Sequence, residues 1–349
     1  MNIKTVRAYS ESLLLTKPYT IARETIATAE IIFFEIELSN GISGKGAANT
    51  DVDVVGETPT QTLQNLQSDL VQQLVGKDIR QFLSLINHYR TTFPKFPGTM
   101  AAIDIALHDA FGKWIGLPVV DFYGRHHSKM LTSVTIGIKN VEETIKEALE
   151  YKQQGFKVLK VKTGLDASED AERVIKLFER FGNHFTVRVD ANEGYKPQDL
   201  YYFLSQTEET NLELIEQPFQ PELDSALLGF PEQTRMALAA DESLKDAKSA
   251  MTIAQQKTFG IFNIKLMKCG GITAAFEIAN IARQAGIELF WGCNDESSLS
   301  ITAALHAAFA CPHTKYLDLD GSLDLIENIS ESGFVLEDGF LSINAQPGF

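Results

Sequence analysis

Short apolar segments alternate with amphipathic helical segments through the last two-thirds of the chain, and this rhythm constrains the fold more than any other feature. Successive strand-like segments begin about 23–29 residues apart, the length of one strand, one helix and their loops. Asn140 and Ser168 have the character of helix N-caps. A series of βα units in one stretch predicts a closed parallel barrel rather than an open sheet. The predicted strands are 133–138, 157–162, 186–190, 213–216, 236–240, 261–265, 287–291 and 316–318.

Both ends of the chain depart from this rhythm. Near the N-terminus, a β-branched segment at 29–39 is followed by the hairpin signal Asn40-Gly41. The last barrel unit has no clear helix before Gly321, and the tail has the pattern of short strands and turns. In the N-terminal region, three helical patterns follow the Asn40-Gly41 hairpin signal, at 60–75, 79–91 and 99–114. We therefore predict a modified TIM (β/α) barrel at 126–320, an N-terminal α+β capping domain at 1–125, and a C-terminal segment at 321–349 that packs back on the capping domain.

Charge and cysteine content restrict the partners and the compartment. The chain has 46 acidic and 31 basic residues, a net charge of −15, so it repels phosphate backbones and lacks the charge of a nucleic-acid-binding protein. It has three cysteines without a CxxC motif, no apolar signal segment, no apolar stretch long enough to cross a bilayer, and no zinc-site spacing among its seven histidines. We expect a cytoplasmic protein with a small-molecule substrate and no nucleic-acid or membrane partner. Homo-oligomerisation is left open.

Charged residues stand at the ends of six of the eight predicted strands. The carboxyl ends of barrel strands form one rim, where the chemistry of such barrels takes place. Strands that simply leave the core can end in polar residues. That explanation does not cover two lysines separated by one residue, then carboxylates on three consecutive strands, then a further lysine. The rim residues are Lys160, Lys162, Asp190, Glu216, Asp241, Lys265 and Asp318.

The residue types at this rim predict metal-assisted proton transfer. Lys160 and Lys162 lie two residues apart on a strand, so both side chains point into the barrel mouth, where each is expected to lower the pKa of the other. Three convergent carboxylates require a cation, and oxygen ligands without His or Cys favour Mg²⁺. Lys265 is expected on the opposite wall. This layout suits removal of a proton next to a carboxylate, with the metal stabilising the enediolate.

Five motifs carry a family resemblance: Lys160-Val161-Lys162, Asp190-Ala191-Asn192, Glu216-Gln217-Pro218, Ala240-Asp241-Glu242-Ser243 and the segment KLMKCGG at 265–271. Over nearly the whole chain, the sequence resembles the muconate lactonizing subgroup of the enolase superfamily, whose sites use a Lys or His base with Mg²⁺. The resemblance implies that Lys162 and Lys265 are the acid–base pair on opposite faces of the substrate α-carbon. It also implies that Lys160 hydrogen-bonds the substrate carboxylate. The implied Mg²⁺ ligands are Asp190, Glu216 and Asp241. Lys268 is expected to be solvated on the loop to the next helix.

The subgroup hosts several reactions on one site, so the motifs identify a half-reaction rather than a substrate. Asp318-Leu319-Asp320 resembles the Asp-x-Asp of dipeptide epimerases, which holds the substrate's N-terminal ammonium by charge-assisted hydrogen bonds. The implied activity is that of an isomerase that inverts the α-carbon of the second residue of an Ala-Xaa dipeptide by two-base proton transfer, in cell-wall peptide metabolism. By the same resemblance, other substrate contacts are Thr135, Cys293, Asn294 and Asp295. No base flanks Cys293, so we expect it to line the pocket rather than act as a nucleophile.

A loop of the capping domain is expected to select the second residue of the substrate. Family members selective for Ala-Glu carry an arginine in this loop, and gap-free matching puts Glu24 at that place, directly after Arg23. Glu24 and Asp295 would repel a γ-carboxylate, so we expect a small, uncharged or apolar second residue, as in Ala-Ala, with a cationic one as runner-up. A shift of one residue restores Arg23 and with it an L-Ala-D/L-Glu epimerase.

Other activities stay open at this point. Within the subgroup, o-succinylbenzoate synthase and N-acylamino-acid racemase use the same half-reaction. A Schiff-base aldolase barrel also uses buried lysines, but the carboxylate triad argues against it. A catalytically inactive barrel with a structural role is at odds with the intact lysines and carboxylates.

Overall fold

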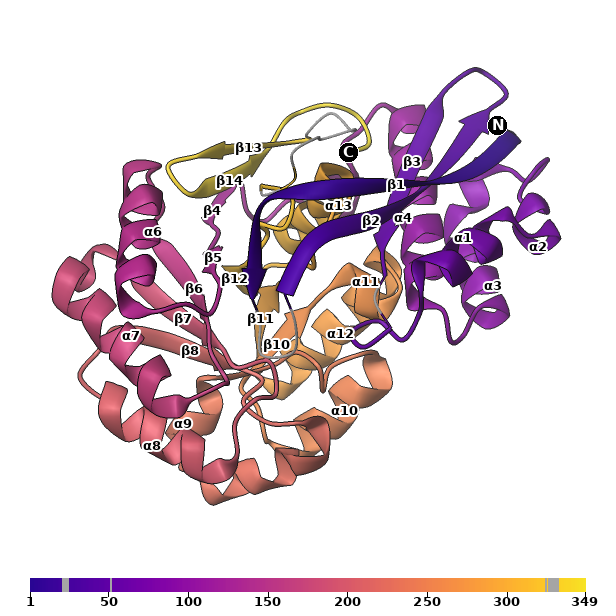
Figure 1. The fold of residues 1–349 in the computed structure, drawn as a ribbon. Helices are drawn as coiled ribbons and strands as arrows, with labels where there is room; N and C mark the ends of the chain where they lie inside the picture. The colour runs from indigo at the N-terminus through magenta and orange to yellow at the C-terminus, as the bar shows by residue number, and fades with distance from the viewer. Residues whose placement is uncertain (21–24, 51, 324, 326–332) are drawn as a thin grey trace.

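A curled sheet of parallel strands forms the centre of the computed structural model, which describes residues 1–20, 25–50, 52–323, 325 and 333–349. Within these residues the sheet has eight strands, β5 to β12, which neighbour one another in chain order (Figure 1). Ser133 N donates a hydrogen bond to Leu317 O over 3.1 Å, so the first and last strands meet. The strands are β5 (Val134–Ile136), β6 (Val158–Lys162), β7 (Thr186–Asp190), β8 (Leu212–Glu216), β9 (Leu238–Ala240), β10 (Ile261–Ile264), β11 (Glu288–Trp291) and β12 (Thr314–Leu317).

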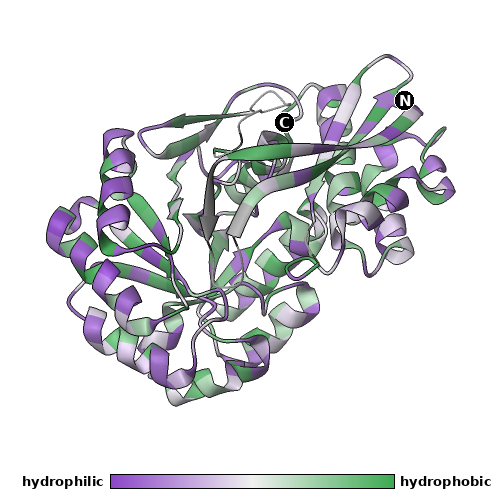
Figure 2. Ribbon diagram, viewed as in Figure 1, coloured by the Kyte–Doolittle hydropathy of each residue, from purple (hydrophilic) through white to green (hydrophobic). Residues whose placement is uncertain are grey.

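The predicted barrel is confirmed, and its strand limits differ from the predicted ones by at most two residues at either end. Helices cover the outside, with hydrophilic residues on their outer faces and hydrophobic residues on the strands (Figure 2). Asp166 caps α7 by accepting from the backbone N–H groups of Ser168 and Glu169, so the predicted cap Ser168 lies inside the helix. The barrel helices are α6 (Val141–Gln153), α7 (Ala167–Phe181), α8 (Pro197–Thr207), α9 (Glu232–Met236), α10 (Ala247–Gln256), α11 (Leu266–Cys269), α12 (Ile272–Ala285) and α13 (Ser298–Ala310). Among the described helices, none is long and apolar enough to cross a membrane.

An apolar cluster fills the inside of the barrel below the charged rim. Its buried members come from five consecutive strands and are Leu214, Ala239, Ile261, Phe290 and Tyr316. Leu214 lies two residues before Glu216 on β8, so both side chains face the same side of the sheet. The Phe290 ring has Lys160 Nζ 5.9 Å and Arg188 Cζ 5.3 Å from its centroid. Packed apolar side chains, rather than a water-filled pore, therefore lie beneath the charged rim.

The capping domain packs a three-stranded antiparallel sheet on a long helix. Two glycines of β3 make this close approach possible. A Cβ added at Gly44 would lie 2.5 Å from Ala110 Cβ, and one added at Gly46 would lie 2.0 Å from Ala102 O. Both alanines belong to α4, whose small buried face fits against the strand. The elements are β1 (Ile3–Thr20), β2 (Thr25–Leu38), β3 (Ser43–Asn49), α1 (Pro59–Gln67), α2 (Asp69–Gln72), α3 (Phe82–Thr92), α4 (Pro97–Ile115) and α5 (Val119–Tyr123).

The capping domain is joined to the barrel through a buried helix cap. Asp104 on α4 accepts hydrogen bonds from Ile272 N and Thr273 N, 2.8 and 3.2 Å away, at the first turn of α12. An ion pair between Arg90 and Glu277, at 2.6 Å, adds a second connection between the same two units. The orientation of the two units therefore depends on a capping carboxylate supplied by one and a helix end supplied by the other.

The C-terminal chain contacts both units. The strands β13 (Phe334–Glu337) and β14 (Phe340–Ile343) form a sheet with β4 (Lys129–Leu131), at the start of the barrel region. The last two residues reach the capping helices instead: Gly348 O accepts from Val119 N at 3.1 Å, and Phe349 N donates to Asp109 at 3.0 Å. The domain limits near 125 and 320 remain our proposal.

We predict that Asp104→Ala lowers the free energy of unfolding by about 2 kcal/mol, because two buried N–H groups of α12 lose their acceptor. Urea unfolding followed by circular dichroism measures the change. The matched variant Asp166→Ala, which removes an exposed cap within the barrel, should cost less. Equal losses in the two variants would contradict a special role for the cap between the units.

Candidate active site

Two lysines and three carboxylates occupy the rim on five consecutive strands. Lys162, Asp190 and Glu216 end β6, β7 and β8, while Asp241 and Lys265 directly follow β9 and β10. In a ring of eight strands, β6 and β10 are four apart and therefore stand on opposite walls. The two predicted bases thus face each other across the barrel mouth, with the carboxylates on the strands between them.

The Lys160 ammonium lies among three carboxylates. Its Nζ is 3.0 Å from Asp190 Oδ2, 2.9 Å from Glu216 Oε2 and 2.8 Å from Asp318 Oδ2, and all four side chains are buried. Lys162 Nζ donates to the same Asp190 oxygen over 2.8 Å. Despite the opposing effect of burial, these carboxylates raise the pKa of Lys160 well above its usual value. The expectation that the two lysines lower each other's pKa is therefore wrong for Lys160, because carboxylates surround it more closely than the second ammonium does.

Glu216 shows that this rim can accept a further cation. Burial, together with the charges of Asp190 and Asp241, raises the pKa of Glu216 to about 8. Its Oε2 makes no aligned hydrogen bond, although Lys160 lies close to it. In the described part of the chain, no three His, Cys, Asp or Glu side chains converge tightly enough to form a metal cluster, and the lysine ammonium groups pair with the carboxylates instead. Hard oxygen donors with an unmatched buried oxygen fit Mg²⁺, and these residues remain our proposed ligands.

Lys268 is buried, contrary to our expectation from the sequence that it is solvated. Its ammonium is buried and donates to both Asp241 O, at 2.5 Å, and Asp241 Oδ1, because the short helix α11 turns the side chain back toward the rim. Lys265 Nζ lies 2.9 Å from the other oxygen of Asp241. Although burial opposes it, these two ammonium groups hold the pKa of Asp241 well below its usual range.

Strained backbone follows the carboxylates at the rim. Gln217, next to Glu216, has a φ of 31°, in a region that non-glycine residues seldom adopt. Its side chain compensates with several hydrogen bonds: Oε1 accepts from Asp241 N at 3.0 Å and Nε2 donates to Ser243 Oγ at 2.8 Å. Gln217 thereby ties the end of β8 to the loop after β9 and fixes the spacing of the two carboxylates.

A line of buried polar groups supports Asp318 from below. Arg188 Nη1 donates to Ser133 Oγ over 3.3 Å, and Ser133 Oγ donates to Asp318 Oδ1 over 2.7 Å. The other oxygen of Asp318 accepts from Lys160. Both Asp318 oxygens therefore have partners within the protein, which suits Asp318 to orient Lys160.

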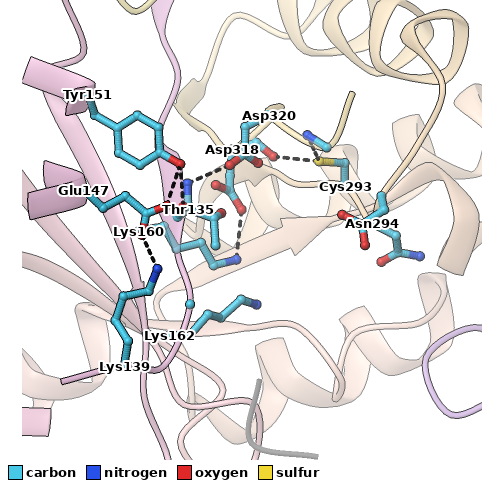
Figure 3. Close-up of a pocket in the computed structure, with 13 residues that line it drawn as sticks. Thr135, Lys139, Glu147, Tyr151, Lys160, Lys162, Cys293, Asn294, Asp318 and Asp320 are labelled. Atoms are coloured by element: carbon cyan, nitrogen blue, oxygen red, sulfur yellow. Dashed lines mark hydrogen bonds and ion pairs between the residues drawn. The ribbon is translucent and has the colours of Figure 1, made fainter. Parts of the chain in front are cut away.

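The substrate-sized space is a cavity of about 180 Å³ at the rim (Figure 3). Asp320, the second member of the Asp-x-Asp motif, lines it and accepts from Thr135 N over 2.7 Å. The predicted contacts Cys293, Asn294 and Asp295 also line it. Glu24 and Arg23 lie outside the described residues. The cavity is lined by Thr135, Gly137, Lys139, Glu147, Tyr151, Lys160, Lys162, Cys293, Asn294, Asp295, Asp318, Asp320 and Gly321.

Two of the cavity side chains on the loop after β11 have distinct chemistry. Burial and the charges of Asp320 and Asp318 raise the pKa of Cys293 well above its usual value, so the thiol is poorly suited to act as a nucleophile. Asn294 Nδ2 is buried and makes no hydrogen bond within the described residues. That amide is a donor suited to a carbonyl oxygen of a ligand.

One wall of the cavity is formed by residues that were not predicted from the sequence. Lys139, Glu147 and Tyr151 line it from the segment after β5 and from α6. Glu147 and Tyr151 are four residues apart and so share one face of the helix, which the sequence does indicate. Nothing in the sequence showed that this face meets the barrel mouth.

The chain matches two family descriptions that together span most of its length. Residues 3–124 match "Mandelate racemase / muconate lactonizing enzyme, N-terminal domain", and residues 143–349 match "Enolase C-terminal domain-like".

Several characterised proteins are similar over the full length. The chain is 48% identical to the L-Lys-D/L-Arg epimerase of Desulforapulum autotrophicum, covering 100% of this chain and 98% of the relative. It is 32% identical over 332 residues to the hydrophobic dipeptide epimerase of Enterococcus faecalis, covering 93% of this chain and 92% of the relative. The crystal structure of the Methylococcus capsulatus dipeptide epimerase with Mg and the dipeptide L-Arg-D-Lys has a TM-score of 0.97 and 45% identity, covering 100% of this chain and 99% of that one.

We predict that Ser133→Ala lowers kcat/KM about 10-fold, because a hydrogen bond to a charged acceptor is worth about 1.5–3 kcal/mol and its loss frees Asp318 to turn away from Lys160. Steady-state kinetics measures the effect. Ser205→Ala, which removes an exposed hydroxyl on α8, is the control. A Ser133→Ala enzyme with wild-type kinetics would show that the line below Asp318 does not orient the site.

Proposed function

We propose that this chain, which belongs to the mandelate racemase/muconate lactonizing enzyme family of the enolase superfamily, is a dipeptide epimerase. Its substrates would be dipeptides with cationic side chains. The observation that carries the reaction type is the pair of lysines on opposite walls with three buried carboxylates between them. Two bases on opposite faces are what inversion of a carbon centre by proton transfer requires.

Lys162 and Lys265 would share the proton transfer at the α-carbon of the second residue. One lysine removes the α-hydrogen from its face as the neutral amine, and the other, as the ammonium, returns a proton from the opposite face. Each is paired with a carboxylate: Lys162 with Asp190 at 2.8 Å and Lys265 with Asp241 at 2.9 Å. These pairs hold the two lysine side chains in place on opposite walls of the barrel mouth.

Asp190, Glu216 and Asp241 would hold Mg²⁺, in keeping with the Mg present in the similar Methylococcus capsulatus structure. These residues would thereby place a Lewis acid at the substrate carboxylate, which would acidify the α-hydrogen. Lys160, buried among Asp190, Glu216 and Asp318, would add a hydrogen bond to the same carboxylate and stabilise the charge that develops there.

The cavity walls suit the two ends of a dipeptide. Asp320 would accept the N-terminal ammonium, since its carboxylate lines the cavity and is oriented by Thr135 N. Asn294 Nδ2 would donate to the peptide carbonyl oxygen. An amino acid whose amine carries a succinyl or other acyl group would present an uncharged amide or a negative charge to Asp320, which argues against N-acylamino-acid racemase activity.

The choice of side chain departs from our sequence-based expectation of a small, uncharged second residue. The 48% identical relative is an L-Lys-D/L-Arg epimerase, which favours our runner-up, a cationic second residue, and also favours a cationic first residue in place of the expected alanine. The cavity supports this choice because four carboxylates and three lysines line it, which gives the lining a formal net charge of −1. The carboxylates are Glu147, Asp295, Asp318 and Asp320. The roles of Glu24 and Arg23 in selecting the second residue stay predictions.

Incubation with a dipeptide library in D₂O, scored by a mass gain of one deuterium, tests the proposal. Dipeptides of lysine and arginine should exchange and epimerise faster than Ala-Ala or Ala-Glu. The proposed specificity fails if Ala-Ala or Ala-Glu is the better substrate, and the proposed activity fails if no dipeptide exchanges.

We predict that Lys162→Ala and Lys265→Ala each lower the epimerisation rate by at least ~10²–10⁴, the usual contribution of a general base. Each variant retains one base, so it can still exchange the α-hydrogen of one epimer without inverting it. Proton NMR in D₂O separates exchange from inversion. Lys248→Ala, on the exposed surface of α10, is the control. Inversion at the wild-type rate in either variant would rule out the two-base assignment.

We predict that activity requires Mg²⁺, and that Asp190→Asn, Glu216→Gln and Asp241→Asn each weaken its binding, because each removes one of three hard anionic ligands. Dialysis against EDTA should abolish epimerisation and added Mg²⁺ should restore it. Isothermal titration calorimetry of the variants gives the affinities, with Asp69→Asn at an exposed position as control. Full activity after EDTA treatment would contradict the metal assignment.

A further inference from the structure

The wall of the cavity formed by Lys139, Glu147 and Tyr151 has no part in the proton transfer or in metal binding. These three side chains lie together beside Thr135 (Figure 3), whereas Cys293 and Asn294 lie on the other side of Asp320. Lys139 comes from the segment between β5 and α6, and Glu147 and Tyr151 come from α6. One cavity thus connects this wall with Lys160 and Lys162 at the rim.

Glu147 is the anionic centre of this wall. Its carboxylate forms an ion pair with the Lys139 ammonium and lies 3.4 Å from Tyr151 Oη. The Glu147 side chain is 12% exposed and the Lys139 side chain 27% exposed, so the carboxylate is the more deeply held partner. Because α6 is a regular helix, Glu147 has a fixed position, while Lys139 reaches it from an irregular segment.

Thr135 links this wall to the proposed ammonium site. Its backbone N donates to Asp320 over 2.7 Å, and its backbone O accepts from Tyr151 Oη over 3.3 Å. Asp320 and the wall therefore contact the same residue of β5. If Asp320 takes the N-terminal ammonium and the lysines take the second α-carbon, the first residue lies beside Thr135 and its side chain faces Glu147.

We infer that Glu147 selects substrates whose first residue carries a cationic side chain, with the ammonium or guanidinium of that residue replacing Lys139 at the carboxylate. This inference rests on the proposed dipeptide epimerase function and assigns the selection of the first residue to a wall distinct from the catalytic rim. A lysine side chain of the substrate offers the same ammonium group that Lys139 supplies within the protein. A neutral first residue would leave the Lys139–Glu147 pair in place and gain nothing from it.

The test compares L-Lys-L-Arg with L-norleucyl-L-Arg, in which the first side chain has similar length and no charge. The wild-type enzyme should prefer the lysyl substrate. Glu147→Gln should lower kcat/KM for L-Lys-L-Arg about 10- to 100-fold, chiefly through KM, and leave the norleucyl substrate unchanged. Glu142→Gln, an exposed change of the same charge on the same helix, is the control and should alter neither substrate.

Lys139→Met supplies an independent readout. If Lys139 competes with the substrate cation for Glu147, its removal should lower KM for L-Lys-L-Arg without lowering kcat. A higher KM would show that Lys139 itself binds the substrate and would overturn the inference. Equal losses for both substrates in Glu147→Gln would overturn it as well, because Glu147 would then be merely structural while dipeptide epimerisation stands. Absence of turnover with any dipeptide in the wild type would instead remove the proposed function and the inference with it.

Discussion

The charged rim of the barrel exists only because ammonium groups are buried together with carboxylates. Asp190, Glu216 and Asp241 are almost fully shielded from solvent, and buried like charges of this kind repel strongly unless cations are interleaved with them. Lys160 supplies such a cation within 3.0 Å of two of them, and Lys265 pairs with the third. Burial, together with the neighbouring carboxylates, raises the pKa of Glu216, and a divalent cation at this rim would favour its charged form. The same arrangement places the two proposed bases, Lys162 and Lys265, on opposite sides of the barrel mouth.

Residues beneath the rim, at the rim and in the capping domain stabilise this arrangement. Beneath the rim, the Phe290 ring lies beside both Lys160 and Arg188. Arg188 donates to Ser133, which in turn donates to the Asp318 carboxylate. At the rim itself, Gln217 has a strained backbone, and its side chain hydrogen-bonds the loop after β9. The helix α12 follows β10, and its buried cap Asp104 comes from the capping domain. The orientation of the capping domain is thus tied to the barrel element that follows one of the two bases.

The reaction and the substrate depend on different parts of the molecule. The rim residues of the proton transfer stand at strand ends, which related barrels can share for the same half-reaction. The side chains proposed to contact the ends of a substrate come instead from loops and from α6. This separation bears on the choice between an uncharged and a cationic second residue. The expectation of an uncharged second residue rested on two positions, Glu24 and Asp295, whereas the similarity to an L-Lys-D/L-Arg epimerase extends over the full length of the chain.

The sequence by itself determined the barrel, the order of its strands and the residues at their ends, because strand and helix periodicity and the common direction of parallel strands are local properties. It also indicated that Lys162 and Lys265 stand on opposite walls, since four strands in a ring of eight make half a turn. Only the tertiary structure decided which charges neutralise which. Lys268 turns inward to Asp241, Lys160 gains a raised pKa instead of a lowered one, and Asp318 is paired with Lys160 and Ser133. Likewise, only the packing of α6 beside the mouth brings Glu147 to the cavity. Burial and the distances between groups remote in sequence set these outcomes, and neither can be calculated from spacing along the chain.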